Sequence, residues 1–595
     1  MRNTLRHRRI RYSVVMIAVI ALVAVFVIRL VDIQVVQAAT LTSESVAKTS
    51  VPQTLYGVRG SIVDRNGTPL ADSVTRYNIT TAPKIVAGFS GKLGGTRIKT
   101  VSVHDALAAL AAVSGGDLAT MEKNISADPN SNFTYLVKGL DVPTYRKVMA
   151  LSIPWIYPEK QAARVYPNGA TAGNLTGFMG TDGAQAGLEY SYNQCLSATN
   201  GSETYERGLD GVMLPGSKVT TKEPVNGGTL QTTIDEDLQY MAEQDIATAA
   251  QSLKATSATA TVSNAKTGEV LALADYPTVD PNNVTPTAQS DPGALGSRAL
   301  TAAYEPGSTM KAIVASALIQ EGKATPTSGV TVPYSRTFPW GGRISDAELH
   351  PTEKLTMTGV LAQSSNVGIT ELGDQLSAQT RFDYMKKFGL FQQNPDIQFP
   401  GQPSWPNQTS PNWDPQTNEN SMFGQGIATT ALQVANVYQT LANGGVRIPL
   451  HFVKGCTKPD GTVIDAPKAT PTRVVSQSTA TQVVDMLQST FKADANGTLA
   501  SMQPISGYNI SAKTGTAQVA LPNGKGYGPD TIISVVGMAP TEDPQYVVTV
   551  TFNKPQTDKY SWAAAPAFRT LMSQVLEKYR VAPSTATPTT YPSSW

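Results

Sequence analysis

The chain has 595 residues, 41% of them hydrophobic, which predicts more than one domain with ordinary globular cores. Its formal net charge is +2, and because five of its 47 basic residues lie within residues 1–11, the rest holds 42 against 45 acidic residues, so a nucleic-acid partner is not indicated. The four histidines form no H-E-x-x-H pair and follow no G-x-S-x-G elbow, so the parts of a zinc hydrolase and of a Ser-His-Asp triad are absent from the sequence.

The N-terminus has the pattern of a membrane anchor. Residues 1–11 are basic and predict a cytoplasmic tail, and residues 12–28 carry no charge. A helix over residues 12–33 is long enough to span a membrane if Arg29 extends its side chain to the far interface. The basic tail places the bulk of this single-pass protein outside the cytoplasm. The alternative is a cleaved signal peptide, but its small-residue site at Ala38 lies well past the apolar stretch, so the uncleaved anchor is preferred.

A non-catalytic domain is predicted over residues 54–235, after a Ser/Thr-rich tether at residues 34–53. It opens with a hairpin that turns at Asn66-Gly67 and contains a helix at residues 104–113 among many turns. The sequence shows no phosphate loop, ligand cluster or carboxylate pair here, which favours a support or interaction role. Two short motifs punctuate the domain, Arg164–Pro167 and Gly187–Tyr190.

Residues 236–582 predict one large α/β unit with strands at both sequence ends and helices in its middle. A helix at residues 237–250 is followed by a hairpin that turns at Lys266–Gly268, and the unit closes with a helix at residues 563–579. The Ser/Thr/Pro composition of residues 583–595 predicts a disordered tail.

The two cysteines, Cys195 and Cys456, belong to an exported region in which a disulfide can form. They are far apart in the chain and lie in different predicted domains. We therefore expect two unpaired thiols, with a bridge as the alternative.

Ser308 and Lys311 are the strongest candidates for chemistry. Pro306-Gly307 makes a turn, and the Ala-rich run after it stops at Gly322, which predicts a buried helix with Ser308 in its first turn. Residues three apart share a helix face, so the lysine amine can reach the serine hydroxyl. Apolar neighbours lower the pKa of such an amine from about 10.4. The serine thereby gains the nearby base that nucleophilic catalysis requires.

A second motif, Ser364–Asn366, interrupts two apolar helical segments. It places hydroxyls and an amide at a buried junction, where these groups need hydrogen-bond partners. The simpler alternative is that the motif only caps a helix.

A third motif, Lys513–Thr516, lies on a predicted strand of small residues at 510–518. Two antiparallel strands follow it, which puts this strand at the edge of a sheet, where a peptide can bind as an added strand. The simpler alternative is a solvated edge lysine that protects against aggregation.

Singly, these motifs are weak signals. The spacing of Ser308 and Lys311 recurs at Ser45, Ser263 and Ser489, and Lys266–Gly268 repeats the Lys-Thr-Gly triplet. Context separates the copies, because they lie in the tether, at a hairpin tip and beside a polar run.

The ordered set of motifs closely resembles class B penicillin-binding proteins, on residues 304–311, 364–366 and 513–518. Arg59–Ala71, which resembles the opening of their pedestal domain, and Phe423–Gly426 are similar as well. The resemblance covers essentially the whole chain. It implies an α/β (α+β) fold with one transmembrane helix, an elongated pedestal (dimerisation-type) domain, and a penicillin-binding, serine β-lactamase-like transpeptidase domain with a central antiparallel sheet flanked by helices.

The resemblance implies a D,D-transpeptidase that cross-links peptidoglycan stem peptides, binds β-lactam antibiotics and uses no cofactor or metal. Ser308 would attack the D-Ala-D-Ala carbonyl and release the terminal D-Ala, and an amine from a neighbouring strand would take the acyl group. In the family pattern, Lys311 is the base, Ser364 relays a proton toward the leaving amine, and Asn366 binds the donor amide.

The third motif has implied binding roles. Lys513 would keep the site positive, which helps to hold the other lysine neutral, and Thr514 and Thr516 would meet the terminal carboxylate. Gly515 would leave the strand surface open to the substrate. The backbone N–H groups of Ser308 and Thr516 would form the oxyanion hole.

Other readings of the resemblance fit less well. A β-lactamase is much shorter, a carboxypeptidase rarely has so large an N-terminal domain, and no glycosyltransferase domain precedes the pedestal. A non-enzymatic scaffold or β-lactam sensor is the alternative from another class. Because the chain has nothing to polymerise glycans with, the implied partners are a SEDS-type glycosyltransferase and other cell-wall synthesis membrane proteins. The short tail and uninterrupted transpeptidase domain favour the septal over the elongation type.

Overall fold

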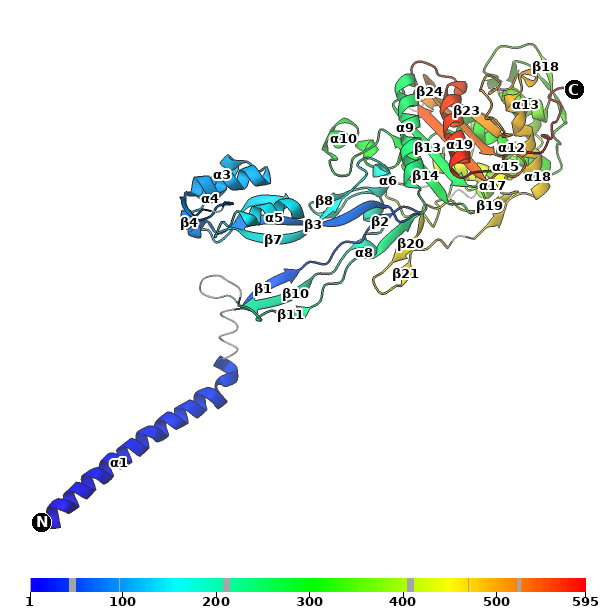
Figure 1. Cartoon of the computed structure of the whole chain (residues 1–595). Coiled ribbons are helices and arrows are strands. Elements are labelled where there is room, and N and C mark those ends of the chain that lie inside the picture. The colour runs from blue at the N-terminus through cyan, green and yellow to red at the C-terminus, as the bar shows by residue number, and fades with distance from the viewer. Residues whose placement is uncertain are drawn as a thin grey trace. The chain divides into compact units, whose positions relative to one another are not determined.

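Figure 1 shows the chain as a computed structural model, which describes residues 2–41, 50–95, 97–206, 214–403, 411–468, 470–521 and 526–595. The chain forms two compact units. One unit comprises Met1–Val58 and Ala198–Asn226, and the other comprises Arg59–Ser197 and Gly227–Trp595. This division differs from the predicted boundary at residue 235, because strands from both sides of that boundary share one sheet.

The first unit holds the apolar helix and a small sheet. Helix α1 (Arg2–Val31) continues as a π-helical turn, η1 (Asp32–Val36), and the span His7–Val36 is long and apolar enough to cross a membrane. This length fits both predicted alternatives, an anchor and a signal sequence, because each needs an apolar helix. The sheet is antiparallel in the order β1-β10-β11. Its strands are β1 (Ser50–Leu55), β10 (Gly201–Glu206) and β11 (Val219–Lys222).

A seven-stranded sheet lies in the second unit. Its order is β21-β20-β12-β2-β3-β6, with β7 also paired to β3. Ile62 pairs with Ala71 across the Asn66-Gly67 turn, which confirms the predicted hairpin. The strands are β2 (Ile62–Val63), β3 (Pro69–Thr81), β6 (Thr134–Leu140), β7 (Tyr157–Val165), β12 (Thr229–Thr232), β20 (Val453–Thr457) and β21 (Val463–Ile464). The helices beside β3, β6 and β7 are α3 (Val103–Ser114), α4 (Leu118–Ser126) and α5 (Val142–Ala150).

A five-stranded antiparallel sheet with the order β14-β13-β25-β24-β23 carries the candidate site at its edge. Its strands bury alternating aliphatic side chains in two cores, one on each face. The strands are β13 (Ser257–Asn264), β14 (Val270–Tyr276), β23 (Ser511–Ala520), β24 (Tyr527–Ala539) and β25 (Tyr546–Asn553).

Helices cover both faces of this sheet. The core of one face is formed with α9 (Glu236–Leu253) and α19 (Ala565–Lys578), which confirms the two helices predicted at the ends of this region. The other core is built from helices of the middle region, so the predicted order of strands and helices also holds. These helices are α12 (Lys311–Gln320), α13 (Met357–Gln363), α14 (Asn366–Gly373), α15 (Ala378–Lys387), α17 (Ala431–Ala442) and α18 (Gln477–Met486).

Cys195 and Cys456 form a disulfide, with their Cα atoms 6.5 Å apart. The expectation of two unpaired thiols is therefore wrong. Its error was to assign the cysteines to separate domains, whereas β20, which carries Cys456, is a strand of the seven-stranded sheet. Both cysteines are buried in a core with Leu196 and Leu230.

We expect the double variant Cys195→Ser/Cys456→Ser to lose about 2–4 kcal/mol of stability, because the bridge constrains the unfolded chain over a separation of 261 residues. The measurement is the midpoint of thermal unfolding. Treatment of the unaltered protein with a reducing agent should lower its midpoint similarly and leave the double variant unchanged. Equal midpoints for the two proteins would show that the bridge is not stabilising.

The C-terminal segment differs from the disordered tail predicted over residues 583–595. The N–H of Thr356 donates to Ser593 O (3.0 Å), and its hydroxyl donates to Pro592 O (2.6 Å). A Cβ on Gly359 would lie 2.0 Å from Ser593 O, so the segment packs closely on the start of α13. The prediction of disorder rested on composition alone. Composition cannot reveal that strand β18 (Glu353–Thr356) offers backbone donors to this segment.

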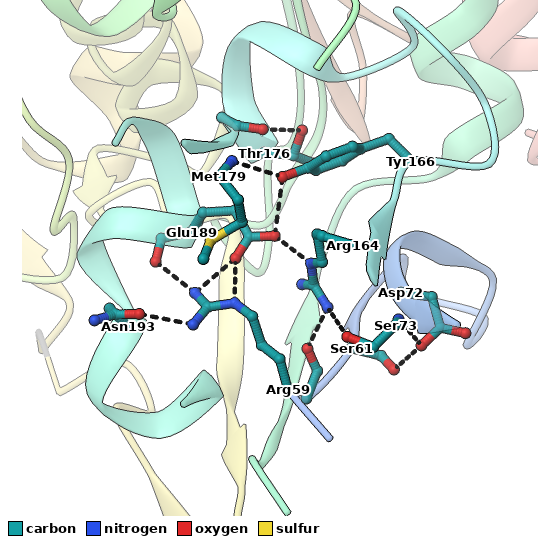
Figure 2. Close-up of polar contacts among 12 residues, drawn as sticks. Arg59, Ser61, Asp72, Ser73, Arg164, Tyr166, Thr176, Met179, Glu189 and Asn193 are labelled. Atoms are coloured by element: carbon teal, nitrogen blue, oxygen red, sulfur yellow. Dashed lines mark hydrogen bonds and ion pairs between the residues drawn. The ribbon is translucent and has the colours of Figure 1, made fainter. Parts of the chain in front are cut away.

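A buried ion cluster connects β7, α7 (Gly187–Ser191) and the segment before β2, as Figure 2 shows. The Glu189 carboxylate is fully buried and lies 2.6 Å from the Arg59 guanidinium and 2.5 Å from that of Arg164. Tyr166 donates its hydroxyl to the same carboxylate (3.3 Å), and Arg164 also donates to Gly60 O (2.8 Å). The three segments that supply this cluster stand out as motifs in the sequence, but their contact could not be predicted, because they are far apart in the chain.

Candidate active site

The candidate nucleophile lies where a short 3-10 turn, η4 (Gly307–Met310), leads into α12. Ser308 is thus in the first turn of a buried helix, as predicted, and Gly322 follows the helix end. Gly307 has a φ of +61°, and a Cβ there would lie 2.5 Å from Thr516 O. Only glycine therefore lets this turn approach strand β23 so closely.

The Lys311 amine connects the first two motifs. It lies 3.0 Å from Ser308 Oγ, 3.2 Å from Ser364 Oγ and 2.8 Å from Asn366 Oδ1, and it also donates to the backbone carbonyl of Ser364. The lysine side chain is fully buried. The predicted contact across one helical turn is therefore present, and the second motif adds its own groups to the same amine.

Burial lowers the pKa of Lys311 to about 7, although the charge of Asp346 acts to raise it. A neutral amine has two N–H donors and one lone pair. The Ser364 carbonyl and the Asn366 amide oxygen can only accept, so they match the two donors. The lone pair is then left for the hydroxyls of Ser308 and Ser364.

The second motif lies at the junction of α13 and α14. Ser364 has a left-handed φ of 63° and ends α13, which turns its hydroxyl and carbonyl toward Lys311. The predicted alternative of helix capping applies to Ser365, whose Oγ accepts the Gly368 N–H at 2.8 Å. Asn366 donates its amide N–H to Ser345 O (3.1 Å), which keeps Oδ1 directed at the lysine.

Lys513 lies on β23, the predicted edge strand, and its side chain is fully buried. The alternative of a solvated edge lysine is therefore wrong. Its amine donates to Ser364 Oγ (2.7 Å) and Thr514 O (3.1 Å). Burial and the neighbouring Lys311 lower the pKa of Lys513. Because both amines contact the Ser364 hydroxyl, the charged form of each disfavours the charged form of the other.

The remainder of the third motif forms the open wall of the site. Thr514 donates its buried hydroxyl to Thr498 Oγ1 (3.0 Å), whereas Thr516 is half-buried. A Cβ at Gly515 would lie 2.5 Å from Ser534 Oγ and 3.0 Å from Pro306 O. Among the strands of the described residues, β23 has β24 on one side and none on the other. Its free edge can therefore pair with an extended peptide.

Asp346 is a site residue that sequence reasoning missed. Its carboxylate accepts the backbone N–H groups of Asn366 (2.6 Å) and Val367 (2.9 Å) and the Ser365 hydroxyl (2.6 Å). A carboxylate at a helix N-terminus satisfies free donors and opposes the helix dipole. Asp346 thus holds the start of α14, and no spacing in the sequence indicated it.

His350 lies on the far side of that carboxylate, 3.1 Å from it through Nε2. Burial lowers the pKa of His350, but the Pro351 carbonyl and the Asp346 carboxylate outweigh this effect, so the pKa is raised overall. The histidine therefore supports Asp346 rather than contacting the serine.

Family comparisons match two consecutive regions of the chain. Residues 54–232 match the Penicillin-binding Protein dimerisation domain, and residues 258–573 match the Penicillin binding protein transpeptidase domain. The chain is 33% identical to Penicillin-binding protein PbpB of Mycolicibacterium smegmatis, covering 97% of this chain and 90% of that protein. It is 30% identical to Peptidoglycan D,D-transpeptidase FtsI of Escherichia coli K12, covering 94% and 90%.

Solved structures of related proteins also match the chain. A peptidoglycan synthetase from Bifidobacterium adolescentis matches with a TM-score of 0.70 and 30% identity, covering 92% of this chain and 100% of that one. Penicillin binding protein 3 from Mycobacterium tuberculosis in complex with ampicillin matches with a TM-score of 0.68 and 27% identity, covering 91% and 100%. With both domains matched in order and nearly full-length relatives, the chain belongs to the class B penicillin-binding proteins.

Proposed function

We propose that this protein is a peptidoglycan D,D-transpeptidase that works through a Ser308 acyl-enzyme. The observation that carries the proposal is the Ser308 hydroxyl 3.0 Å from a buried, deprotonatable lysine, beside the free edge of β23. A stem peptide ending in D-Ala-D-Ala would pair with that edge. FtsI and PbpB match nearly the full chain. Their names, a peptidoglycan D,D-transpeptidase and a penicillin-binding protein, support this substrate class and the binding of β-lactams.

In the first half-reaction, Ser308 Oγ attacks the carbonyl of the penultimate D-Ala. Lys311 takes the hydroxyl proton, and Ser364, within 3.2 Å of that amine, passes a proton to the leaving D-Ala nitrogen. The C–N bond breaks, D-Ala departs and the ester remains. In the second half-reaction, an amine of a neighbouring stem peptide attacks the ester, forms the new amide and returns the proton to Ser308.

The remaining roles concern binding. The terminal carboxylate of the donor peptide would meet the hydroxyls of Thr514 and Thr516, with Gly515 allowing close approach. This carboxylate favours the charged form of Lys513, and the resulting charge leaves Lys311 neutral. Asn366 would hold the donor amide. The N–H groups of Ser308 and Thr516 would bind the oxyanion, an arrangement typically worth ~3 kcal/mol per donor.

A fluorescent penicillin and a synthetic stem peptide test this function. The protein should become covalently labelled at Ser308, located by mass spectrometry, and should release D-Ala while joining the peptide to an added acceptor amine. Ser308→Ala should lose both reactions. Labelling of another residue would overturn the proposal, and complete failure to label would favour the non-enzymatic scaffold.

The acylation rate should rise with pH through a midpoint near 7, since Lys311 acts in its neutral form and its pKa is about 7. Asp346→Asn removes the negative charge that raises this pKa. We therefore expect the midpoint of the variant to move to lower pH. The measurement is the rate constant for penicillin acylation from pH 5.5 to 8.5. A flat profile in the unaltered protein, or an upward shift in the variant, would contradict the assignment of the base.

We further propose a single-pass anchor at α1 with the catalytic region outside the cytoplasm. The basic start of the chain and the buried disulfide support this orientation, because disulfides persist in oxidising compartments. The likeness to FtsI and PbpB supports a role in septal synthesis. We propose a SEDS-type glycosyltransferase as its partner. Co-purification of such an enzyme from membranes tests the partnership, and recovery of this chain alone would count against it.

A further inference from the structure

A cavity of about 400 Å³ lies between the start of α17, the segment after α15 and strand β19 (Val446–Arg447). Its volume falls in the range of small-molecule sites. None of the residues assigned to the active site lines it. The cavity therefore needs its own explanation, and its charged and polar lining residues suggest one.

Arg447 is the unusual group in this cavity. Its Nε is buried, and the guanidinium has no hydrogen-bond or ion-pair partner among the residues that the structure describes. Burial lowers the pKa of Arg447, and a buried cation without a partner costs free energy. The second cation at the cavity, Lys468, is exposed and likewise has no side-chain partner in the described parts of the chain. No described acidic residue lines the cavity, and the nearby Asp396 accepts the Lys468 backbone N–H (2.8 Å).

The neutral side chains that line the cavity indicate which further groups a ligand would carry. The side-chain NH₂ groups of Gln392, Gln393 and Gln402 donate to backbone carbonyls, at 2.8, 3.4 and 2.9 Å. Their amide oxygens accept no hydrogen bond from the described residues. The cavity thus offers a positively charged guanidinium group together with several neutral hydrogen-bond acceptors. A complementary ligand combines one anionic group with N–H or O–H donors.

We propose that this cavity binds a carboxylate-bearing sugar or sugar-peptide. The planar guanidinium of Arg447 matches a carboxylate through two parallel hydrogen bonds. The free glutamine oxygens match hydroxyl and amide N–H groups, and they disfavour the additional charged oxygens of a phosphate. This site is separate from Ser308, so it stands or falls independently of the proposed catalytic function.

The test uses the full chain in detergent after reaction with penicillin, which occupies the active site. Titration calorimetry with N-acetylmuramic acid and with N-acetylmuramyl-L-alanyl-D-isoglutamine compares a sugar acid with a sugar-peptide carboxylate. We expect saturable binding of at least one of them. N-acetylglucosamine, which lacks the carboxylate, and acetate, which lacks the donors, should each bind at least tenfold more weakly.

Arg447→Met should weaken binding roughly tenfold or more, since it removes a charge-assisted hydrogen-bond pair. Its midpoint of unfolding should not fall, because the guanidinium has no partner to lose. Lys468→Gln, at an exposed position, should weaken binding about two- to fivefold and keeps the test valid if the first variant is unstable. Lys458→Gln is the matched control, since Lys458 is exposed and does not line the cavity. Unchanged affinity in Arg447→Met, equal binding of acetate, or no saturable binding by any probe would overturn the proposal.

Discussion

We expect Lys311→Ala to lower the rate constant for acylation of Ser308 by penicillin by a factor of about 10²–10⁴, the range typical of a lost general base. The physical reason is the position of the amine, which is fully buried and 3.0 Å from the serine hydroxyl. Lys311 is the only ionisable side chain that contacts the Ser308 hydroxyl among the described residues, so no other base is in direct contact with it. Stopped-flow measurement with a chromogenic β-lactam gives the rate constant directly.

The chain offers a matched control for this experiment. Ser263 and Lys266 have the same spacing, but Lys266 is at a hairpin turn, where it forms an ion pair with Asp543 (2.8 Å). We expect penicillin to acylate the Lys266→Ala variant at the same rate as the unaltered protein. The role of Lys311 as base would be refuted if Lys311→Ala, folded by its unfolding midpoint, acylated within threefold of the original protein.

The second large effect is on stability. Glu189→Gln should lower the free energy of unfolding by roughly 3–5 kcal/mol, because it leaves two arginines in the cluster of Figure 2 without their counter-charge. Denaturant unfolding followed by tryptophan fluorescence measures the loss.

The control is Glu122→Gln, which removes a carboxylate from an exposed contact with His104. Exposed pairs contribute little, so we expect a change within about 0.5 kcal/mol. A similarly small change for Glu189→Gln would mean that the buried cluster is not held by this carboxylate.

Local patterns in the sequence correctly predicted the contacts between residues that are close together in the chain. The contact of Ser308 with Lys311 follows from helical spacing, and the β2–β3 hairpin follows from its Asn-Gly turn. The contact of Lys513 with Ser364 joins residues 149 apart, and only the family resemblance suggested it. Spacing alone could not, because the path of the chain between them depends on tertiary packing.

The features that the sequence did not predict also depend on tertiary packing. Asp346 supports α14 from a preceding loop, and Glu189 meets one arginine from β7 and one from the segment before β2. Cys456 lies on a strand that joins a sheet begun much earlier in the chain. In each case the local sequence did not indicate the partner of the residue. Its role arises from a partner that the pattern of apolar and polar residues cannot locate.

The placement of β20 beside β12 has a consequence for biogenesis. As the polypeptide leaves the ribosome, β12 emerges with one edge unpaired, and its partner is made only when residues 453–457 follow. The seven-stranded sheet therefore cannot be completed in the order of translation, and the nascent chain must keep that edge away from other molecules until late in synthesis. Truncated products that end before residue 453 should aggregate rather than accumulate as a folded N-terminal fragment.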